Sequence, residues 1–298
     1  MTAARASFAD LLKPGFHDIF MERYKKYPPE FPKIANELTS NRQYEDDSYV
    51  SGFGTAPEKV EGVSVTFDDP YQGYDKRYTH TTFGLGFRVT REMYDDDLYG
   101  KMRKMPKALA NSLMITTEQD VANVLNRGFT STYAGGDGKE LFATDHPLLA
   151  GGTEQNELTN VSDFNEDTYE QALIDIAATT DDRALPVQLF PELLIVSQNN
   201  AWRAAKLLNS AQAPFDGTSA INPAKGTLSE GYTVNHYLTD TDAWYIKCRD
   251  HALNIFWRRK PEFDQDNDVS TQDAIFVGTA RWSTGWSEWR GWFGSPGV

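Results

Sequence analysis

Residues 106–129 read PKALANSLMITTEQDVANVLNRGF, and this stretch decides the architecture of the chain. Its apolar residues recur at the three- and four-residue spacing of one helix face: Leu109, Leu113, Val121, Val124, Leu125 and Phe129. Pro106 suits the first turn of a helix, where its missing N–H costs nothing, and Gly128 lies where a helix stops. The pattern predicts an amphipathic helix of about 35 Å, long enough to be the spine of a domain. A first helical piece is expected from about Thr90 to the proline.

Upstream of this helix, residues 49–90 have the pattern of a long β-hairpin. Residues 60–67 alternate apolar and polar side chains with the period of a strand. Residues 68–73, DDPYQG, form a turn cluster, and residues 77–83 supply a β-rich return. Only one face of this hairpin is apolar, and its tip is rich in charge and glycine. We therefore expect a protruding loop.

The first 50 residues lack the pattern of a self-contained core. Residues 27–32, YPPEFP, carry proline at three of six positions, which excludes a regular helix or a central strand there. Four apolar side chains around them nevertheless need burial: Tyr24, Tyr27, Phe31 and Ile34. We expect an extended arm whose anchors are buried either on a neighbouring molecule or on the arm's own domain.

Downstream of the spine, helices and strands alternate. Asn165 is the predicted cap of a helix over residues 166–180. The buried stripe of that helix is predicted to be Tyr169, Leu173, Ile176 and Ala177. A buried strand is expected at residues 193–196 and a helix at residues 200–209. The polar loop over residues 210–231 is long for a compact domain, which indicates a function. Further strands are predicted near residues 232–237, 244–247, 253–258 and 274–293, which makes the fold α+β.

Four tryptophans lie close to the C-terminus: Trp282, Trp286, Trp289 and Trp292. Their spacing would suit a helix, but Gly278, Gly285 and Gly291 favour bent strands. So much indole surface indicates either a tightly packed core or an interface.

Composition excludes several classes of protein. The 298 residues suffice for one large domain or two intertwined ones. We expect no membrane span, because no run of about 20 apolar residues is present, and no secretory signal, because the first ten residues lack its apolar core. Cys248 is the only cysteine, so an internal disulfide is excluded and synthesis in a reducing cytoplasm is indicated.

The charge balance disfavours a protein that grips nucleic acid. The formal net charge is −14, whereas phosphate binding needs clustered cations. Two basic clusters are interpreted mainly as solvated surface: Lys101, Arg103, Lys104 and Lys107, and then Arg258, Arg259 and Lys260. An acidic wall suits a container for nucleic acid, since it repels DNA weakly and does not trap it.

Signatures of catalysis and cofactor binding are absent from the sequence. It has no nucleophile elbow, zinc-protease motif, Walker loop or dinucleotide-binding glycine pattern. The five histidines, which lack the spacing of metal ligands, are His17, His80, His146, His236 and His251. We therefore predict no catalytic residue, no cofactor-binding residue and no metal site.

Three local patterns come closest to chemistry. Residues 264–268, DQDND, begin like a calcium loop, but Val269 stands where the sharp turn needs glycine, so an exposed acidic turn is expected. Asp145 and His146 are adjacent, and adjacent side chains seldom face each other; no nucleophile accompanies them. Cys248 lies in an apolar strand pattern and is expected to be buried and inert.

Several stretches of the chain are recognisable in their order and spacing. Residues 83–100 read FGLGFRVTREMYDDDLYG and lead into the spine helix. NVLNRGF at residues 123–129 is followed by DGKELF at residues 137–142 and by His146-Pro147. Near the end come FWRRKPEF at residues 256–263 and WSTGWSEWRGWFGS at residues 282–295. Together they resemble the HK97-fold phage major capsid proteins, and in particular the Mu-like major head subunit family.

The resemblance implies an HK97-like capsid fold of class α+β with five parts. It implies an N-terminal arm at residues 1–48 and an extended loop at residues 49–90 that lies across a neighbour. A peripheral domain with the spine helix follows at residues 91–185. An axial domain is implied at residues 186–269, with its long loop near the centre of a ring of subunits. Terminal strands at residues 270–298 return to the peripheral domain.

The resemblance also implies a function and partners. Pentamers and hexamers of a major capsid protein would form an icosahedral shell in the virion, assembled in the host cytoplasm. The shell would enclose double-stranded DNA without sequence-specific binding. A separate scaffold protein is expected, since the arm begins almost at Met1, together with a portal and decoration proteins. We expect no Lys–Asn crosslink between subunits, because Lys59, Lys76 and Asn267 match no crosslinking motif.

Two other functions remain open at this level. An encapsulin-like protein compartment shares the fold but encloses cargo enzymes, and a groove for a cargo peptide would distinguish it. An acidic α/β enzyme is disfavoured by the absent motifs.

Overall fold

The chain divides into two compact units, each built from three stretches of sequence. The structure is a computed structural model of the whole chain, and it describes residues 8–90, 92–93, 96, 100–212, 220–268 and 273–298. Unit 1 comprises Met1–Glu45, Tyr78–Val121 and Ile255–Thr284. Unit 2 comprises Asp46–Arg77, Ala122–Asn254 and Gly285–Val298. Each unit is therefore assembled from residues that lie far apart in the sequence.

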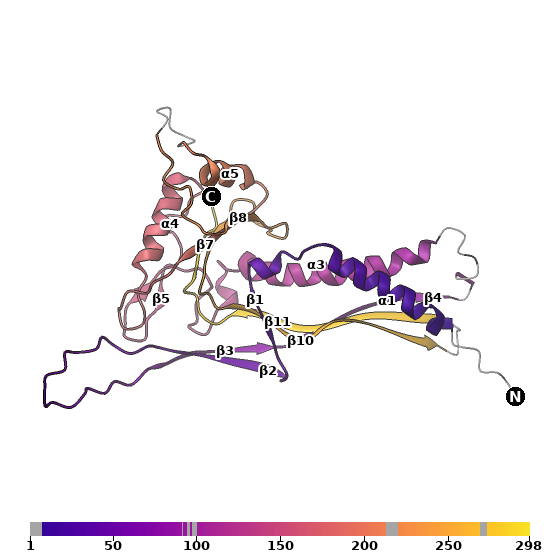
Figure 1. Cartoon of the computed structure of the whole chain (residues 1–298), viewed down its shortest axis with the longest axis horizontal. Helices are drawn as coiled ribbons and strands as arrows, with labels where there is room; N and C mark the ends of the chain where they lie inside the picture. The colour runs from indigo at the N-terminus through magenta and orange to yellow at the C-terminus, as the bar shows by residue number, and fades with distance from the viewer. Residues whose placement is uncertain (1–7, 91, 94–95, 97–99, 213–219, 269–272) are drawn as a thin grey trace. The chain divides into compact units, whose positions relative to one another are not determined.

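Unit 1 contains a four-stranded sheet in the order β1-β10-β11-β4 (Figure 1). The strands are β1 (Asn36–Thr39), β4 (Thr81–Val89), β10 (Leu253–Asp268) and β11 (Asp273–Trp286). β4 pairs antiparallel with β11 without a bulge, from Thr81 opposite Trp282 to Val89 opposite Ala274. Because β4 ends the sheet, one of its edges has no partner among the described strands.

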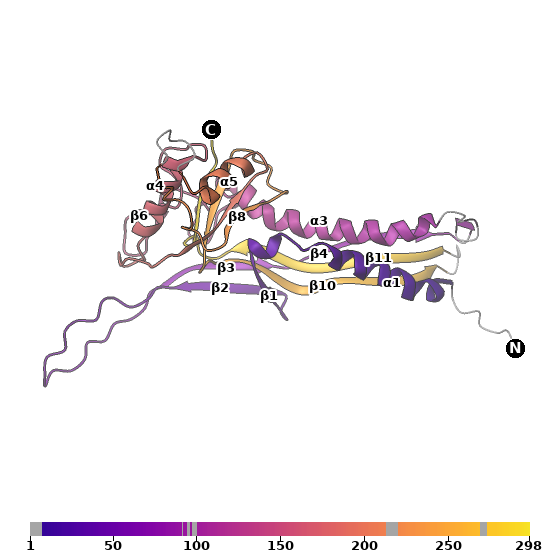
Figure 2. The ribbon, with the colours of Figure 1, turned by 45° about the horizontal axis from the view of Figure 1, so that its top comes forward.

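Two helices cover one face of this sheet (Figure 2). A 3₁₀ turn, η2 (Lys101–Arg103), leads into α3 (Lys104–Asn126), which has Pro106 in its first turn. The predicted spine helix is thereby confirmed, and its 23 residues give about 35 Å. The core between helices and sheet includes Leu109, Leu113, Phe16, Phe20, Phe263 and Phe276. The first helical piece predicted from about Thr90 falls largely outside the described residues.

The N-terminal arm packs on its own unit, and much of it is helical. The prediction of an extended arm was wrong for α1 (Phe8–Lys26), whose Phe16, Phe20 and Tyr24 recur every four residues on one helix face. The Pro-Gly pair at residues 14–15 obscured that pattern. After the proline elbow, a 3₁₀ turn, η1 (Phe31–Lys33), begins with the buried Phe31. Ile34 is also buried, whereas Tyr27 is 46% exposed.

A buried carboxylate fixes the elbow to the spine helix. The two oxygens of Glu118 on α3 accept the backbone N–H groups of Glu30 at 2.8 Å and Phe31 at 2.9 Å. These N–H groups open η1 and have no partner within that short turn. Burial, aided by the nearby Glu30 charge, raises the pKa of Glu118 to about 7. The carboxylate thus acts as the cap of a turn that lies far from it in sequence.

Unit 2 is built on a second four-stranded sheet, in the order β12-β9-β7-β8. Its strands are β7 (Pro191–Val196), β8 (Gly231–Val234), β9 (Trp244–Cys248) and β12 (Trp292–Ser295). β7 runs parallel to β8 and antiparallel to β9, and β9 runs antiparallel to β12. The predicted buried strand at residues 193–196 is confirmed as part of β7, which has a neighbour on each side.

The two predicted helices of this unit are confirmed as α4 (Glu166–Ala178) and α5 (Ala201–Asn209). Asn165 caps α4: its Oδ1 accepts the N–H of Thr168 at 3.0 Å, and the Thr168 hydroxyl accepts the N–H of Asn165 in return. The core under both helices includes Tyr169, Ala172, Ile176, Ala204 and Leu207. Ala177, expected in the buried stripe, is exposed, and Ala172 takes its place.

The C-terminal tryptophans belong to strands and to the core. Trp282 and Trp286 lie in β11 and Trp292 in β12; Trp289 joins these strands, and all four are buried. The expected acidic turn at residues 264–268 was wrong, because β10 continues through it. Its pattern stays period-two, with Phe263 buried and the neighbouring Asp264 exposed.

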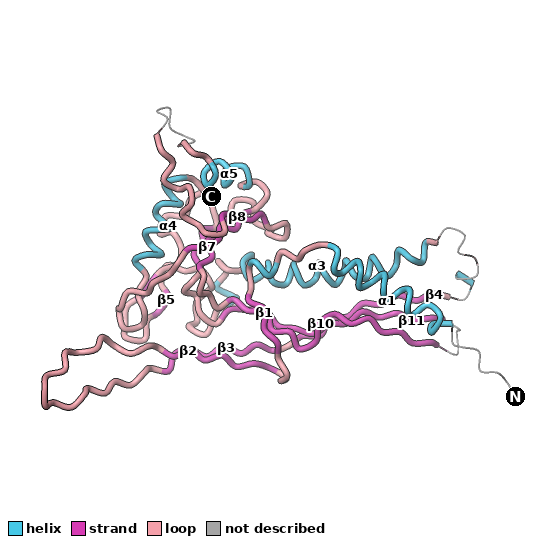
Figure 3. Tube along the Cα trace, in the orientation of Figure 1, coloured by secondary structure: helices cyan, strands magenta, loops and turns pink. Residues whose placement is uncertain are grey.

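Short elements complete unit 2: η3 (Ser131–Tyr133), β5 (His146–Pro147) and β6 (Thr153–Glu154). A separate two-stranded ladder consists of β2 (Tyr44–Val50) and β3 (Gln72–Thr79). Residues 51–71 join these strands and are named the β2–β3 loop; Figure 3 draws them as loop throughout.

The β2–β3 loop differs from the predicted hairpin. The predicted strand at residues 60–67 was wrong: Val63 N–H bonds to Val60 C=O at 3.2 Å, which places the turn at Glu61 and Gly62. Gly62 has φ +80°, as the third residue of a type II turn requires. Residues 64–71 belong to no strand. Alternation alone does not make a strand, because a strand also needs a partner, and Pro57 in the opposite arm has no N–H to offer.

Candidate assembly interface

The β2–β3 loop carries apolar side chains that the chain leaves exposed. Phe67 is 92% exposed and Phe53 is 63% exposed, and Val60, Val63 and Val65 lie between 58% and 61%. The two arms of the loop surround an open cavity of about 630 Å³ lined by loop residues alone. A soluble chain seldom presents so much contiguous apolar surface unless a partner covers it. This loop is therefore the strongest candidate for contact with another molecule.

Hydrogen bonds close the neck of the loop, where it leaves the ladder. The N–H of Ser51 bonds to the Tyr71 carbonyl and the N–H of Tyr71 to the Ser51 hydroxyl, both at 2.9 Å. Further out, the N–H of Gly54 bonds to Asp68 Oδ2 at 2.8 Å. The Gly54 N–H, followed by the Arg183 charge, lowers the pKa of Asp68. The neck keeps the two arms together although they form no ladder.

An arginine from a distant loop holds this neck in place. Arg183 Nη1 lies 2.6 Å from Asp68 Oδ2, and Nη2 donates to the carbonyl of Asp69 at 2.5 Å. The guanidinium carbon also lies 4.5 Å from the centre of the Tyr71 ring. A planar guanidinium suits this combination of bidentate bonding and stacking, which a lysine would not reproduce. Arg183 with Asp68, Asp69 and Tyr71 is named the arginine clamp.

The turn that presents Arg183 is unusually tight. Asp181 Oδ1 accepts the N–H groups of Arg183 and Leu185, both at 2.8 Å. Between them, Ala184 has φ +58°, the left-handed region that L residues avoid at roughly 1–2 kcal/mol. Strained backbone of this kind concentrates where geometry serves a function. Here the turn directs the guanidinium at the loop.

The β2/β3 ladder is anchored to the body of unit 2. Lys76 Nζ donates to the Ala134 carbonyl at 3.2 Å and lies 5.8 Å from the Trp286 ring centre. Gly136 approaches so closely that a Cβ there would lie 2.9 Å from the Asp75 carbonyl oxygen. The loop thus projects from a fixed base.

Buried charged side chains lie next to the β2/β3 ladder. Arg290, 8% exposed, pairs with Glu288 at 2.8 Å and donates to the Thr180 carbonyl at 3.0 Å. Its guanidinium lies 5.8 Å from the ring centre of Tyr49 on β2. Burial raises the pKa of Glu288, and the adjacent Arg290 opposes that shift. Since both partners are largely removed from water, breaking this pair would be costly.

His146 has a structural environment rather than a catalytic one. Its Nδ1 lies 2.7 Å from Asp137 Oδ2, its Nε2 lies 3.1 Å from Asn156 Oδ1, and its ring stacks on Trp289 at 4.4 Å. Asp145, the neighbour considered in the sequence, pairs with Lys139 instead. The side chains of His146 and Asp137 are 0% and 4% exposed, so no substrate reaches them.

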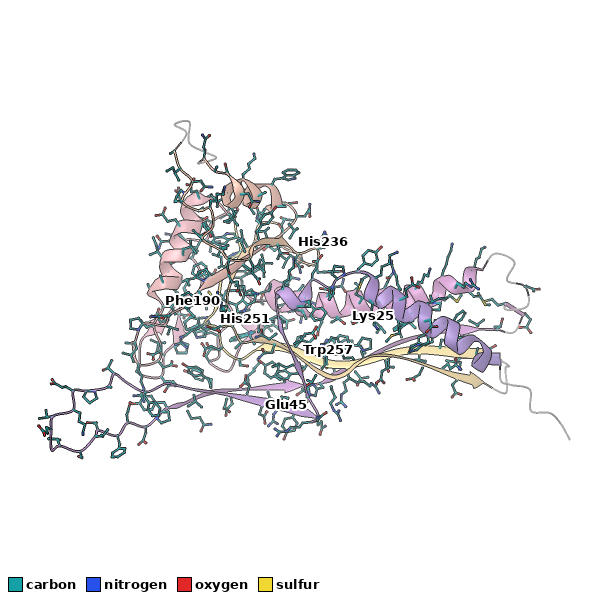
Figure 4. The ribbon with its side chains drawn as sticks, in the orientation of Figure 1. Lys25, Glu45, Phe190, His236, His251 and Trp257 are labelled. Atoms are coloured by element: carbon teal, nitrogen blue, oxygen red, sulfur yellow. The ribbon has the colours of Figure 1, made fainter. Side chains whose placement is uncertain are left out.

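The thiol of Cys248 and the imidazoles of His251 and His80 are each engaged in structural contacts. Burial raises the pKa of the Cys248 thiol to about 12. His251, labelled in Figure 4, is edge-on to Trp292, and burial lowers its pKa to about 4. His80 bonds to Ser40 and Ser283. Within the described ranges, no group of three or more His, Cys, Asp or Glu side chains could hold a metal ion.

Both basic clusters lie on the surface. Lys101, Arg103, Lys104 and Lys107 are exposed around the start of α3. In the second cluster, Arg259 lies 3.7 Å from Glu262 and Lys260 lies 3.6 Å from Glu37. Of the lysines weighed for crosslinking, Lys76 is engaged at the base of the β2–β3 loop, and Lys59 is exposed in that loop; the side chain of Asn267 lies outside the described residues.

Further exposed apolar side chains belong to unit 2. Trp202 on α5 is 78% exposed, Ile221 is 86% exposed, and Phe190, labelled in Figure 4, is 52% exposed. Ile221 lies in the long polar loop. Its backbone forms an isolated β-bridge with Gln212, and the neighbouring Asn222 is buried, so this part of the loop is held in place. These exposed side chains add to the case for a chain that contacts others.

The arginine clamp and the His146–Asp137 pair escaped the sequence analysis. Arg183 is 115 residues from Asp68, and no local pattern connects them. A signal for the histidine was present, since Asp137 and His146 both lie in the recognisable segment after the spine helix, nine residues apart.

Comparison with solved structures identifies the class of fold. The capsid of bacteriophage JBD30 aligns with a TM-score of 0.56 at 14% identity, covering 72% of this chain and 92% of that one. The capsid of the native GTA particle gives 0.56 at 12% identity, covering 88% of each chain. The virus-like particle from Pyrococcus furiosus gives 0.53 at 11% identity, covering 95% and 98%. The fold is that of HK97-like capsid subunits, as the resemblance predicted.

The family follows from the sequence match. Residues 73–294 match the family described as phage capsid protein. This chain belongs to the phage capsid protein family and is a structural protein of the capsid shell. No curated protein matches the chain. The narrower Mu-like assignment stays a prediction.

None of the helices in the described part of the chain combines the length and the hydropathy needed to cross a bilayer.

Proposed function

We propose that this chain is the major head subunit of a tailed phage and forms pentamers and hexamers in an icosahedral shell around double-stranded DNA. The observation that carries this proposal is the β2–β3 loop, whose Phe67 is 92% exposed while its neck is held by the arginine clamp. A free chain gains nothing by fixing apolar side chains in water. A subunit that lays the loop on its neighbour buries them, at about 25 cal/mol for each Å² of apolar surface.

The role of each segment in the shell is the one that the resemblance implies. Residues 1–48 act as the arm, 49–90 as the extended loop and 91–185 as the peripheral domain with the spine helix. Residues 186–269 form the axial domain, except that β10 pairs with β11 in the sheet of unit 1 and so belongs with the spine helix, and residues 270–298 return to the peripheral domain. The exposed Trp202 and Ile221 fit contacts near the centre of a ring, where several axial domains meet.

The charge of the chain suits the enclosed cargo and its partners. A net charge of −14 keeps the wall from binding DNA tightly, so DNA is enclosed without sequence-specific contacts. A scaffold protein directs assembly in the host cytoplasm, and a portal and decoration proteins complete the virion. The JBD30 capsid is decorated with trimers of a minor capsid protein, which makes a similar partner reasonable here.

The second candidate is an encapsulin-like protein compartment. The observation that favours it is the match to the virus-like particle of Pyrococcus furiosus, which extends over 95% of this chain. Such a shell would assemble without a scaffold and would enclose protein cargo rather than DNA. Shells from cells that express only this chain, containing one co-purified host enzyme, would favour the compartment.

Electron microscopy of the purified chain tests the proposal. Negatively stained samples, with and without a scaffold candidate from a neighbouring gene, should contain closed shells or rings of five and six subunits. Phe67→Ser should reduce the yield of shells at least tenfold, whereas Ile174→Ser, which removes an exposed side chain of α4, should not. A monomer in every preparation, across salt and pH, would overturn the proposal.

A further inference from the structure

The outer edge of β4 pairs with no strand in the part of the chain that the structure describes. β4 ends the sheet of unit 1 and pairs with β11 without interruption, so its second row of N–H and C=O groups faces no described strand. Exposed edges are usually blocked by lysine, proline or a bulge. β4 reads TTFGLGFRV, with Arg88 as its only charge, and six of its nine residues are exposed. Such an edge is a template for another strand.

A segment of the same chain is suited to be that strand. Residues 63–67 read VSVTF, which has the composition and the alternation of a β-strand. Beyond the turn at Gly62 these residues belong to no strand, and Val63, Val65 and Phe67 are all more than half exposed. Residues 63–67 therefore have the sequence of a β-strand but no paired strand in the free chain.

The faces of the two segments match. On β4, the odd-numbered face holds Phe83 stacked on Trp282 at 4.1 Å, Phe87 stacked on Phe276 at 5.1 Å, and Leu85 between them at 50% exposure. The even-numbered face holds small or polar residues: Thr82, Gly84, Gly86 and Arg88. Residues 63–67 have the same division, with valines and phenylalanine on one face and Ser64 and Thr66 on the other. Side by side, the two would form one continuous apolar face.

We propose that residues 63–67 of one copy add as a strand to the free edge of β4 in a second copy. This inference rests on the proposed function, since it names the surface on which the β2–β3 loop docks in the shell. The segment spans about 17 Å, which lies within the length of β4. The added strand covers Leu85 and the outer edges of Phe83 and Phe87. Main-chain bonds supply the attraction, and the alternating side chains set the register.

A proline scan distinguishes strand addition from simple side-chain contact. In a ladder, successive N–H groups point to opposite sides, and only every second one reaches the partner edge. Among Ser64→Pro, Val65→Pro and Thr66→Pro, the effects should therefore alternate: Ser64→Pro and Thr66→Pro act alike and Val65→Pro acts oppositely, with one class reducing shell yield at least tenfold and the other far less. The unfolding temperature of the free subunit should not change, because the loop forms no ladder there.

Disulfide trapping tests which edge is used. One copy carries Leu85→Cys and the other carries Val63→Cys, Val65→Cys or Phe67→Cys; the native Cys248 is buried and inert. Facing residues of neighbouring strands have Cβ atoms about 4.5–5.5 Å apart, and a disulfide needs about 3.5–4.5 Å, so a small local approach of the facing pair permits the bond. One of the three mixtures should give a covalent dimer of the two copies, whereas Leu85→Cys mixed with Ile174→Cys should give none.

The outcomes separate this inference from the function on which it rests. Shells that form with no alternation in the proline scan and no trapped dimer overturn the strand addition and leave the shell function standing. If the parent chain forms no shells and the cysteine variants form no trapped dimer, both are overturned. Alternation together with a trapped dimer supports both.

Discussion

At the scale of single residues, Glu118 of α3 holds the proline elbow of the arm to the spine helix. It is 3% exposed, and its oxygens cap the turn at Glu30 and Phe31. Its pKa of about 7 in the fold lies above the ordinary 4.5, so the folded chain binds this proton more tightly than the unfolded chain. The resulting contribution to the free energy of unfolding is complete below about pH 4.5 and is lost as the pH rises through about 7. Its size is on the order of 3 kcal/mol.

Glu118→Gln should therefore change stability in a pH-dependent way. Glutamine stays neutral, but its amide NH2 faces one of the two N–H groups donor to donor, whereas both oxygens of the carboxyl group can accept even when it is protonated at pH 5. We expect the variant to be less stable than the parent by about 1–2 kcal/mol at pH 5, and the difference to shrink or change sign at pH 8.5. Denaturant unfolding of the free subunit measures this, and Glu170→Gln, on an exposed face of α4, is the control. A difference that is the same at both pH values would contradict the assignment.

At the scale of elements, the structure separates a rigid base from an exposed loop. The β2/β3 ladder is fixed to the body of unit 2 through Lys76, Gly136 and Tyr49, while the β2–β3 loop is held at its neck by the arginine clamp. An isolated two-stranded ladder is marginally stable in water, so these anchors matter. The loop keeps its direction because Arg183 bonds to two successive residues of one arm.

Arg183→Lys should loosen the loop without unfolding the unit. Lysine keeps the charge but loses the bidentate bonding and the stacking on Tyr71. We expect residues 51–71 to be cut by a protease several times faster in the free subunit, with an unchanged unfolding temperature. Arg249→Lys, an exposed arginine of unit 2, is the matched control. Equal cleavage rates in variant and parent would show that the clamp does not restrain the loop.

The cap of α4 offers a simpler prediction at the same scale. Asn165→Ala removes the acceptor for the Thr168 N–H and one half of a reciprocal pair. We expect a loss of about 1 kcal/mol in the free energy of unfolding. Asn165→Asp, which keeps an acceptor at the helix start, should restore most of it in the same denaturation experiment. A loss as large in Asn165→Asp as in Asn165→Ala would contradict the cap.

At the scale of the whole molecule, charge opposes assembly and apolar burial drives it. Each chain carries a net charge of −14, so copies that approach one another repel. Salt screens this repulsion, with a Debye length of about 10 Å at 0.1 M. The apolar surfaces around Phe67 and Trp202 are little affected by such concentrations. The balance therefore shifts toward assembly as salt is added.

Shell yield at fixed protein concentration should accordingly rise between about 20 mM and about 200 mM sodium chloride. Light scattering follows the assembly, and electron microscopy confirms that the scattering particles are shells. Phe67→Ser should remain poorly assembled at both salt concentrations. A yield that falls as salt rises would mean that attractive ion pairs between copies, rather than apolar contacts, hold the shell.

Local patterns were sufficient for most regular elements outside the arm and the β2–β3 loop, and for the fold class. The spacing from Leu109 to Leu125 specified α3, Asn165 specified the start of α4, and the apolar run in β7 specified a strand in the middle of a sheet. Each of these depends on residues within one or two turns or on an immediate neighbour. The order of such segments also carried the family resemblance, and the predicted fold class is confirmed.

The sequence by itself therefore determined most of the helices and strands outside the arm and the β2–β3 loop, the lack of a catalytic motif and the membership of a capsid family, because those properties depend on short-range patterns. Tertiary structure alone decided the rest. The arm packs on unit 1 through Phe16 and Phe20. His146 bonds to Asp137 rather than to Asp145, and Arg183 pairs with Asp68. Residues 63–67 are left without a ladder. A paired strand, an ion pair and the arginine clamp each need two groups in contact. When those groups lie far apart in the sequence, only the packing of the whole chain brings them together.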